Sequence, residues 1–199
     1  NCFHLREYSA RKGYTFSKTN QLIFNFKCKP SICAADGRRK HYKALSIRAF
    51  AADLRGSIDE QHVPLVTWVP VPPSKVPGHV EYDDRLERVL HTAFAGYQAD
   101  IRCLLRQSGS VEADHASDDR ISEPELRGLL QIDHKALGTQ PLRQHIVLFD
   151  DVITTGKHFK CCEHHLKAIT PAGHPIFGLF IARSVRPPMF QELDDSELV

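Results

Sequence analysis

The chain has 199 residues, 42% of them hydrophobic and 25% charged, so it can bury one sizeable core and has the composition of an ordinary globular domain. Its net charge of +2, with no basic stripe interleaved with aromatic residues, argues against a nucleic-acid partner. No run approaches the roughly 18–20 apolar residues of a membrane helix, and the N-terminus lacks the apolar core of a secretion signal. We therefore expect a cytoplasmic protein that binds neither membranes nor nucleic acid.

The first third of the chain is expected to form a small accessory lobe over residues 1–60. Alternating apolar residues on either side of a polar turn at residues 17–20 predict a β-hairpin over residues 14–29. Apolar residues then recur at helical spacing from Tyr42 to Leu54, which predicts a helix in this region.

Three segments dominated by apolar and β-branched residues predict buried strands at residues 63–71, 145–149 and 176–182. The first is followed by a helical period over residues 82–105, and the second by one over residues 159–169. Strands that alternate with helices indicate a parallel sheet with helices on its faces. The predicted class is therefore α/β.

The segment between the long helical period and the second buried strand has weaker signals. Residues 107–121 contain Ser, Gly, His and several acids without an apolar pattern, which predicts a mobile loop. Ser122 followed by Pro124 then predicts the capped first turn of a short helix.

The most informative segment follows the second buried strand and reads Asp150-Asp151-Val152-Ile153-Thr154-Thr155-Gly156-Lys157-His158. Its turn places backbone N–H groups at the start of the next helix, where the helix dipole favours a phosphate, and Gly156 lets the phosphate approach closely. The adjacent carboxylates can accept hydrogen bonds from sugar hydroxyls and help to order a hydrated Mg²⁺. Neither GxxxxGK[ST] nor GxGxxG occurs in the chain. The sequence thus predicts a ribose-phosphate site at this turn.

Residues 146–158 resemble the phosphoribosyl pyrophosphate signature of type I phosphoribosyltransferases, which has four apolar residues, two acids, two apolar residues and a short Thr/Gly turn. The strand ending Val-Pro-Val-Pro-Pro-Ser-Lys at residues 69–75 is also similar to the competence-associated and related orphan members of that family. The resemblance covers residues 61–185. It implies a type I phosphoribosyltransferase-like parallel sheet over those residues and an N-terminal hood built on the hairpin lobe. The acids in residues 186–199 predict an acidic tail after this core.

The resemblance also implies a role for each matching residue. Asp150 and Asp151 would hold the ribose hydroxyls and meet Mg²⁺ indirectly, through water or the ribose. The 5′-phosphate would be surrounded by Thr154, Thr155, Gly156, Lys157 and His158, where His158 replaces the final Thr of the family. Pyrophosphate would be contacted by Pro72, Pro73, Ser74, Lys75 and Arg85. The residues expected to act in catalysis are Lys75, Arg85, Asp150 and Asp151.

The implied activity is a Mg²⁺-dependent transfer of ribose 5-phosphate from phosphoribosyl pyrophosphate to a nitrogenous base, with release of pyrophosphate, in a homodimer. Thr154 stands where hypoxanthine-type enzymes carry an Asp, which argues against a 6-oxopurine acceptor. That missing Asp, and the acidity of residues 107–121 where the family places a lid, keep an alternative open. The alternative is a non-catalytic module that senses phosphoribosyl pyrophosphate, or a defence effector that consumes it.

Overall fold

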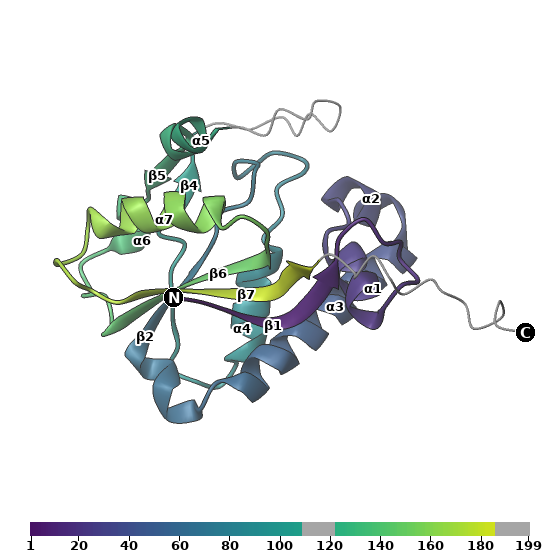
Figure 1. Cartoon of the computed structure of the whole chain (residues 1–199), viewed down its shortest axis with the longest axis horizontal. Coiled ribbons are helices and arrows are strands. Elements are labelled where there is room, and N and C mark those ends of the chain that lie inside the picture. Colours follow the sequence, from purple (N-terminus) through teal and green to yellow (C-terminus); the bar gives the residue numbers. More distant parts are fainter. Residues whose placement is uncertain (109–121, 186–199) are drawn as a thin grey trace, which may run out of the picture.

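The computed structural model describes residues 1–108 and 122–185, and its centre is a five-stranded parallel sheet (Figure 1). The strands, in spatial order, are β1 (Cys2–Ser9), β7 (Ile176–Val185), β6 (His145–Ile153), β2 (Val66–Pro70) and β3 (Asp100–Ile101). Neighbouring strands pair in parallel throughout. The predicted α/β class, with a parallel sheet flanked by helices, is confirmed.

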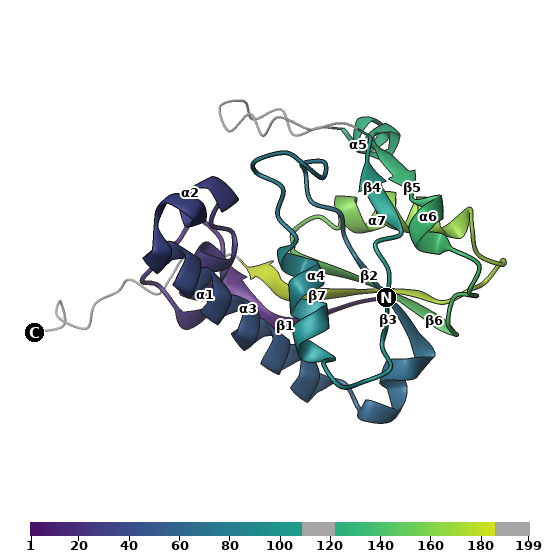
Figure 2. The ribbon, with the colours of Figure 1, turned by 180° about the vertical axis from the view of Figure 1, so that it is seen from behind.

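Helices lie on both faces of this sheet (Figures 1 and 2). The helix α7 (Lys157–Lys167) covers one face, while α3 (Gly37–Ser57) and α4 (Arg85–Ala93) pack together on the other. Because both faces are covered, side chains of the central strands such as Trp68 and Phe149 are almost completely buried. Within the described ranges, no helix has the length and apolarity needed to cross a bilayer.

Smaller elements complete the fold outside the central sheet. The strands β4 (Leu105–Gln107) and β5 (Leu130–Ile132) form an antiparallel pair, and the capped helix predicted after Ser122 is present as α5 (Glu123–Leu129). Ser122 and Glu125 form a reciprocal capping box at its start. The remaining short elements are η1 (Glu60–Leu65) and α6 (His134–Leu137). The predicted loop at residues 107–121 lies almost entirely outside the described residues.

The predicted β-hairpin at residues 14–29 is wrong, because this segment contains the helix α1 (Lys18–Phe26), followed by α2 (Pro30–Ala35). Ser17 caps α1 by accepting a hydrogen bond from the backbone N–H of Asn20. Ile23 and Phe26 are buried, whereas Phe24 is exposed, as helical spacing requires. A short apolar run can fit both the two-residue period of a strand and the roughly 3.6-residue period of a helix, so the apparent alternation led to the wrong prediction.

The helix predicted over residues 82–105 is much shorter in the structure. α4 ends at Ala93, and Gly96 follows with a backbone φ of +86°, a conformation that stops a helix. The chain then enters β3 and β4. β1 was not predicted at all, and it adds residues from the expected accessory lobe to the edge of the central sheet.

One contact fixes how closely α7 approaches the sheet. A Cβ atom added at Gly178 in β7 would lie 2.8 Å from the ring of Phe180 and 2.9 Å from that of Phe159 in α7. We expect Gly178→Ala to lower the free energy of unfolding by roughly 1–3 kcal/mol in urea titrations, because the packed rings must shift. Gly128→Ala in α5, where nothing lies within 4 Å, is the matched control. Equal stability of both variants would show that α7 packs less closely than described.

Candidate functional site

The candidate site lies where the strand order of the sheet reverses. From β2 the chain moves outward to β3, whereas β6 lies on the other side of β2 and is followed outward by β7. Open parallel sheets bind ligands in the crevice outside the carboxyl ends of their strands at such a point. Pro70 at the end of β2 pairs with Phe149, directly before the acid pair. The structure therefore brings the loops that follow β2 and β6, beginning at residues 71 and 154, to the same carboxyl end of the sheet.

The two acids of the predicted site are both buried at this edge. Asp150 is 9% exposed and Asp151 is 8% exposed. The Oδ1 atom of Asp150 accepts a hydrogen bond of 2.7 Å from the backbone N–H of Asp151, and Oδ1 of Asp151 accepts one from Val152 N at the same distance. Each bond ties a carboxylate to the backbone N–H of the next residue, so both side chains are held in place within the last part of β6.

Asp151 is held by two cations from other parts of the chain. Nη2 of Arg85 lies 2.7 Å from its Oδ2 atom, and Nζ of Lys27 lies 3.0 Å from its Oδ1 atom. Arg85 was predicted to contact pyrophosphate, and here it links the acid pair to the start of α4. The guanidinium also lies 5.4 Å from the ring centre of Phe26, so α1 packs directly against it.

Arg85 extends this pairing into the interior. Its Nη1 atom lies 2.8 Å from Oδ2 of Asp83, and the same oxygen lies 2.7 Å from Nζ of Lys43 in α3. The side chains of Lys43 and Asp83 are 6% and 8% exposed. We call this alternating series the charge chain; its members, in order, are Lys27, Asp151, Arg85, Asp83 and Lys43.

The pKa values of the two acids move in opposite directions. Burial, reinforced by the negative charge of Asp151, raises the pKa of Asp150 to about 7. Burial would also raise the pKa of Asp151, but the positive charges of Lys27 and Arg85 outweigh it and lower that pKa to about 2. One carboxylate is therefore ionised over the whole neutral range, while its neighbour gains or loses a proton near neutrality.

The turn after β6 has the form expected of a phosphate site. Gly156 has a φ of +75°, a conformation that favours glycine, and it caps the start of α7. Gly156 at the N-cap has no side chain to cap the helix, and Oγ1 of Thr155 accepts a long hydrogen bond of 3.4 Å from the backbone N–H of Lys157. The Thr154 and Thr155 side chains are exposed beside it, and Lys157 and His158 form its first turn.

The residues present suit only one mode of magnesium binding. Within residues 1–108 and 122–185, no three His, Cys, Asp or Glu side chains gather as a metal cage. Mg²⁺ is commonly held by one or two carboxylates together with water and the phosphates of a ligand. Asp150 and Asp151 fit that arrangement, in which the ligand supplies most of the coordinating oxygens.

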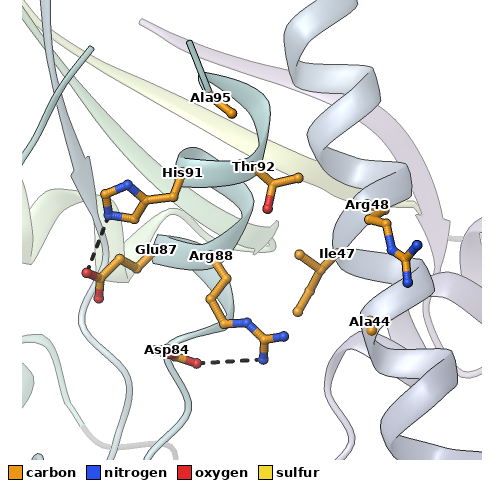
Figure 3. Close-up of a pocket in the computed structure, with 9 residues that line it drawn as sticks. All are labelled: Ala44, Ile47, Arg48, Asp84, Glu87, Arg88, His91, Thr92 and Ala95. Carbon is orange, nitrogen blue, oxygen red and sulfur yellow. Dashed lines mark ion pairs between the residues drawn. The ribbon is translucent and has the colours of Figure 1, made fainter. Parts of the chain in front are cut away.

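A second groove, between α3 and α4, is separate from this site (Figure 3). The Arg88–Asp84 pair at 3.9 Å and the His91–Glu87 pair at 3.6 Å lie along it, each linking positions four residues apart in or just before α4. Such exposed pairs are ordinary features of a helix surface. Asp150, Asp151 and the turn at residues 154–158 do not line this groove.

The acid pair and the turn after it were expected from the sequence, whereas Lys27, Lys43 and Asp83 were not. Lys43 did carry a signal, since it falls four residues before Ile47 on the buried face of its helix, where a charge requires a partner. Lys27 and Asp83 carried none. The sequence matches no protein-family model and no curated protein, so the function of the site must be inferred from its own residues and geometry.

Proposed function

We propose that the chain is a Mg²⁺-dependent phosphoribosyltransferase of the type I fold. It would bind phosphoribosyl pyrophosphate at the carboxyl ends of β2 and β6 and transfer ribose 5-phosphate to a nitrogenous acceptor. The observation that carries the proposal is the turn itself, in which a buried acid pair and a helix N-terminus that begins at a glycine are separated by only a few residues at the reversal of strand order. Sugar hydroxyls and a phosphate on one ligand need that combination.

The two ends of the ligand meet different parts of the site. Asp150 and Asp151 accept the ribose hydroxyls. The 5′-phosphate lies against the N-terminus of α7, with donors from Thr154, Thr155, Gly156, Lys157 and His158. Pyrophosphate faces the loop after β2, where it meets Pro73, Ser74 and Lys75.

In the reaction, the bond between C1′ and the pyrophosphate oxygen breaks and its electron pair leaves with pyrophosphate. The acceptor nitrogen forms the new bond to C1′ and loses its proton to solvent. Negative charge grows on the departing oxygens, where the cation Lys75 stabilises it. Mg²⁺, when bound, neutralises part of the same charge.

Arg85 and Lys27 set a condition for ligand binding. Both already neutralise Asp151, so the ribose hydroxyls must share or displace those contacts. Lys27 is the more exposed partner, because 44% of its side chain is accessible, compared with 22% for Arg85. We assign Arg85 to holding Asp151 in place and Lys27 to yielding when the ribose enters.

Calorimetric titration of phosphoribosyl pyrophosphate with Mg²⁺ tests the proposal. The wild type is expected to bind, and Asp150→Asn/Asp151→Asn is expected to lose binding, because both acceptors of the ribose hydroxyls lose their charge. Asp84→Asn, which changes a half-exposed acid beside Arg85, is the matched control and is expected to bind like the wild type. Pyrophosphate release is then assayed with a panel of nitrogenous bases. No binding by the folded wild type would disprove the proposed function.

The charge chain favours a second candidate function, a non-catalytic sensor of the same ligand. If ribose displaces Lys27 from Asp151, the change is passed directly to α1 in the N-terminal lobe, where a partner could detect it. A defence effector that consumes the ligand would instead show turnover. Binding without pyrophosphate release from any base would select the sensor. Homodimerisation and a cytoplasmic location remain predictions from the family resemblance and the sequence.

A further inference from the structure

The N-terminal lobe contains a pocket of about 410 Å³ at the side of α1 that faces residues 12–14 and α2. Pockets of this size are typical of small-molecule sites. Tyr14 and Phe24 form one wall, with their ring centres 5.4 Å apart and their planes at 77°. The two residues are 42% and 53% exposed, so they present aromatic surface that the fold itself leaves uncovered.

Positive charge surrounds these rings. Four basic residues line the pocket, and no Asp or Glu is among its lining residues. The guanidinium of Arg39 lies 5.7 Å from the centre of the Phe24 ring, and thus joins the aromatic wall. The other basic residues of the lining are Lys12, Lys27 and Lys29. A site with flat aromatic walls and only cations suits an anionic aromatic ligand.

The loop that borders the pocket is fixed by one buried side chain. Asn20, which is 2% exposed, donates from Nδ2 to the backbone carbonyls of Ser9 at 3.1 Å and Lys12 at 3.3 Å. Arg11, within the same loop, has a φ of +66°, which is uncommon for a residue with a side chain. The loop is therefore held in one shape before any ligand arrives.

We infer that this pocket binds a planar aromatic compound of one or two rings that carries a carboxylate or a similar anionic group. Lys27 lines the pocket and also pairs with Asp151 in the candidate site, so the two sites share a side chain. Resting on the proposed function, the bound compound is the acceptor for ribose 5-phosphate. An anionic ring would draw Lys27 toward itself and leave Asp151 open to the ribose hydroxyls.

Matched acid and amide probes test this inference with the full chain. Indole-2-carboxylate and pyridine-3-carboxylate are titrated beside their carboxamides, which keep the ring and remove the charge. We expect each acid to bind about tenfold more tightly than its amide at low salt, because the cations face only the charged form. The preference should shrink as salt is added. Equal affinity of acid and amide would overturn the assignment of an anionic ligand.

Variants of the aromatic wall locate the binding. Phe24→Ala is expected to weaken the binding of indole-2-carboxylate about tenfold, and Phe24→Tyr to restore it, because the stacking surface returns. Phe3→Ala is the control, since Phe3 is 57% exposed but lies on β1 beside Phe177. An equal loss in both alanine variants would overturn the location.

Separate titrations distinguish this inference from the proposed function. If phosphoribosyl pyrophosphate binds but neither acid does, the pocket inference fails and the proposed function stands. If the acids bind but phosphoribosyl pyrophosphate does not, the acceptor role fails together with the proposed function.

Discussion

Asp150→Asn is expected to raise the free energy of unfolding at pH 8 by roughly 2–4 kcal/mol, although it removes a residue of the candidate site. The ionised carboxylate is buried beside the ionised Asp151, whereas the amide is neutral. The amide oxygen can still accept the hydrogen bond from the backbone N–H of Asp151, so the local geometry is kept. Stability gained by removing a charge is typical of a group kept for its function.

Asp150 also gives the stability of the wild type a pH dependence. The pKa of Asp150 is about 7 in the folded protein and near 3.8 in the unfolded chain. Between these values the folded protein keeps a proton that the unfolded chain has lost, so the contribution of Asp150 to the free energy of unfolding falls as the pH rises from about 4 to about 7. Asp150→Asn should show no such fall. Urea titrations at several pH values between 4 and 8 measure the difference.

Asp151→Asn is the matched control, and its effect has the opposite sign. The pKa of Asp151 lies at about 2, below its ordinary value of 3.8, so its ionised form stabilises the folded protein above pH 4 and this contribution is lost as the pH falls toward 2. Replacing it removes the counter-charge of Lys27 and one of the two ion pairs of Arg85, and we expect a loss of about 2 kcal/mol at pH 8. If both substitutions changed stability in the same direction, the two acids would not differ in environment as described.

The sheet and the acid loop could be predicted because their signals are local. Buried parallel strands such as β2 and β6 appear as continuous apolar runs, and the acid pair with its turn is contiguous in sequence. The edge strand β1 has no such run, because none of its residues is buried. It pairs with β7, which lies near the other end of the chain. Its place in the sheet depends on tertiary contacts that no local pattern encodes.

The charge chain could not be predicted for the same reason. Its ion pairs join residues far apart in the sequence: Arg85 and Asp151 are separated by 66 positions, and Lys27 and Asp151 by still more. Only the fold brings α1 and α3 to the end of β6. The pocket beside α1 depends equally on that helix, and the alternation of Leu22, Phe24 and Phe26 led to the prediction of a strand there. Local motifs thus pointed to the turn of the candidate site, and three-dimensional packing determined what surrounds it.

Asp83→Asn is expected to lower the free energy of unfolding by about 3–5 kcal/mol, which would make it the most destabilising single change in the charge chain. Asp83 pairs with Lys43 at 2.7 Å and with Arg85 at 2.8 Å, and the Lys43 side chain is only 6% exposed. Removing the carboxylate leaves a buried ammonium without its counter-charge. Urea titration at pH 7 measures the loss.

A double-mutant cycle identifies the source of that loss. Lys43→Met alone should cost less, because Asp83 keeps its pair with Arg85, and Lys43→Met/Asp83→Asn should cost less than the sum of the single variants, since no stranded ammonium remains. Asp84→Asn, which changes the half-exposed neighbouring acid, should stay within about 1 kcal/mol of the wild type. Additive effects of Lys43→Met and Asp83→Asn would mean that the two side chains do not interact. The cycle thereby tests the interior half of the charge chain, in which Asp83 pairs with Lys43 and Arg85. Through Arg85, this half also supports the ionised carboxylate of Asp151 at the end of β6.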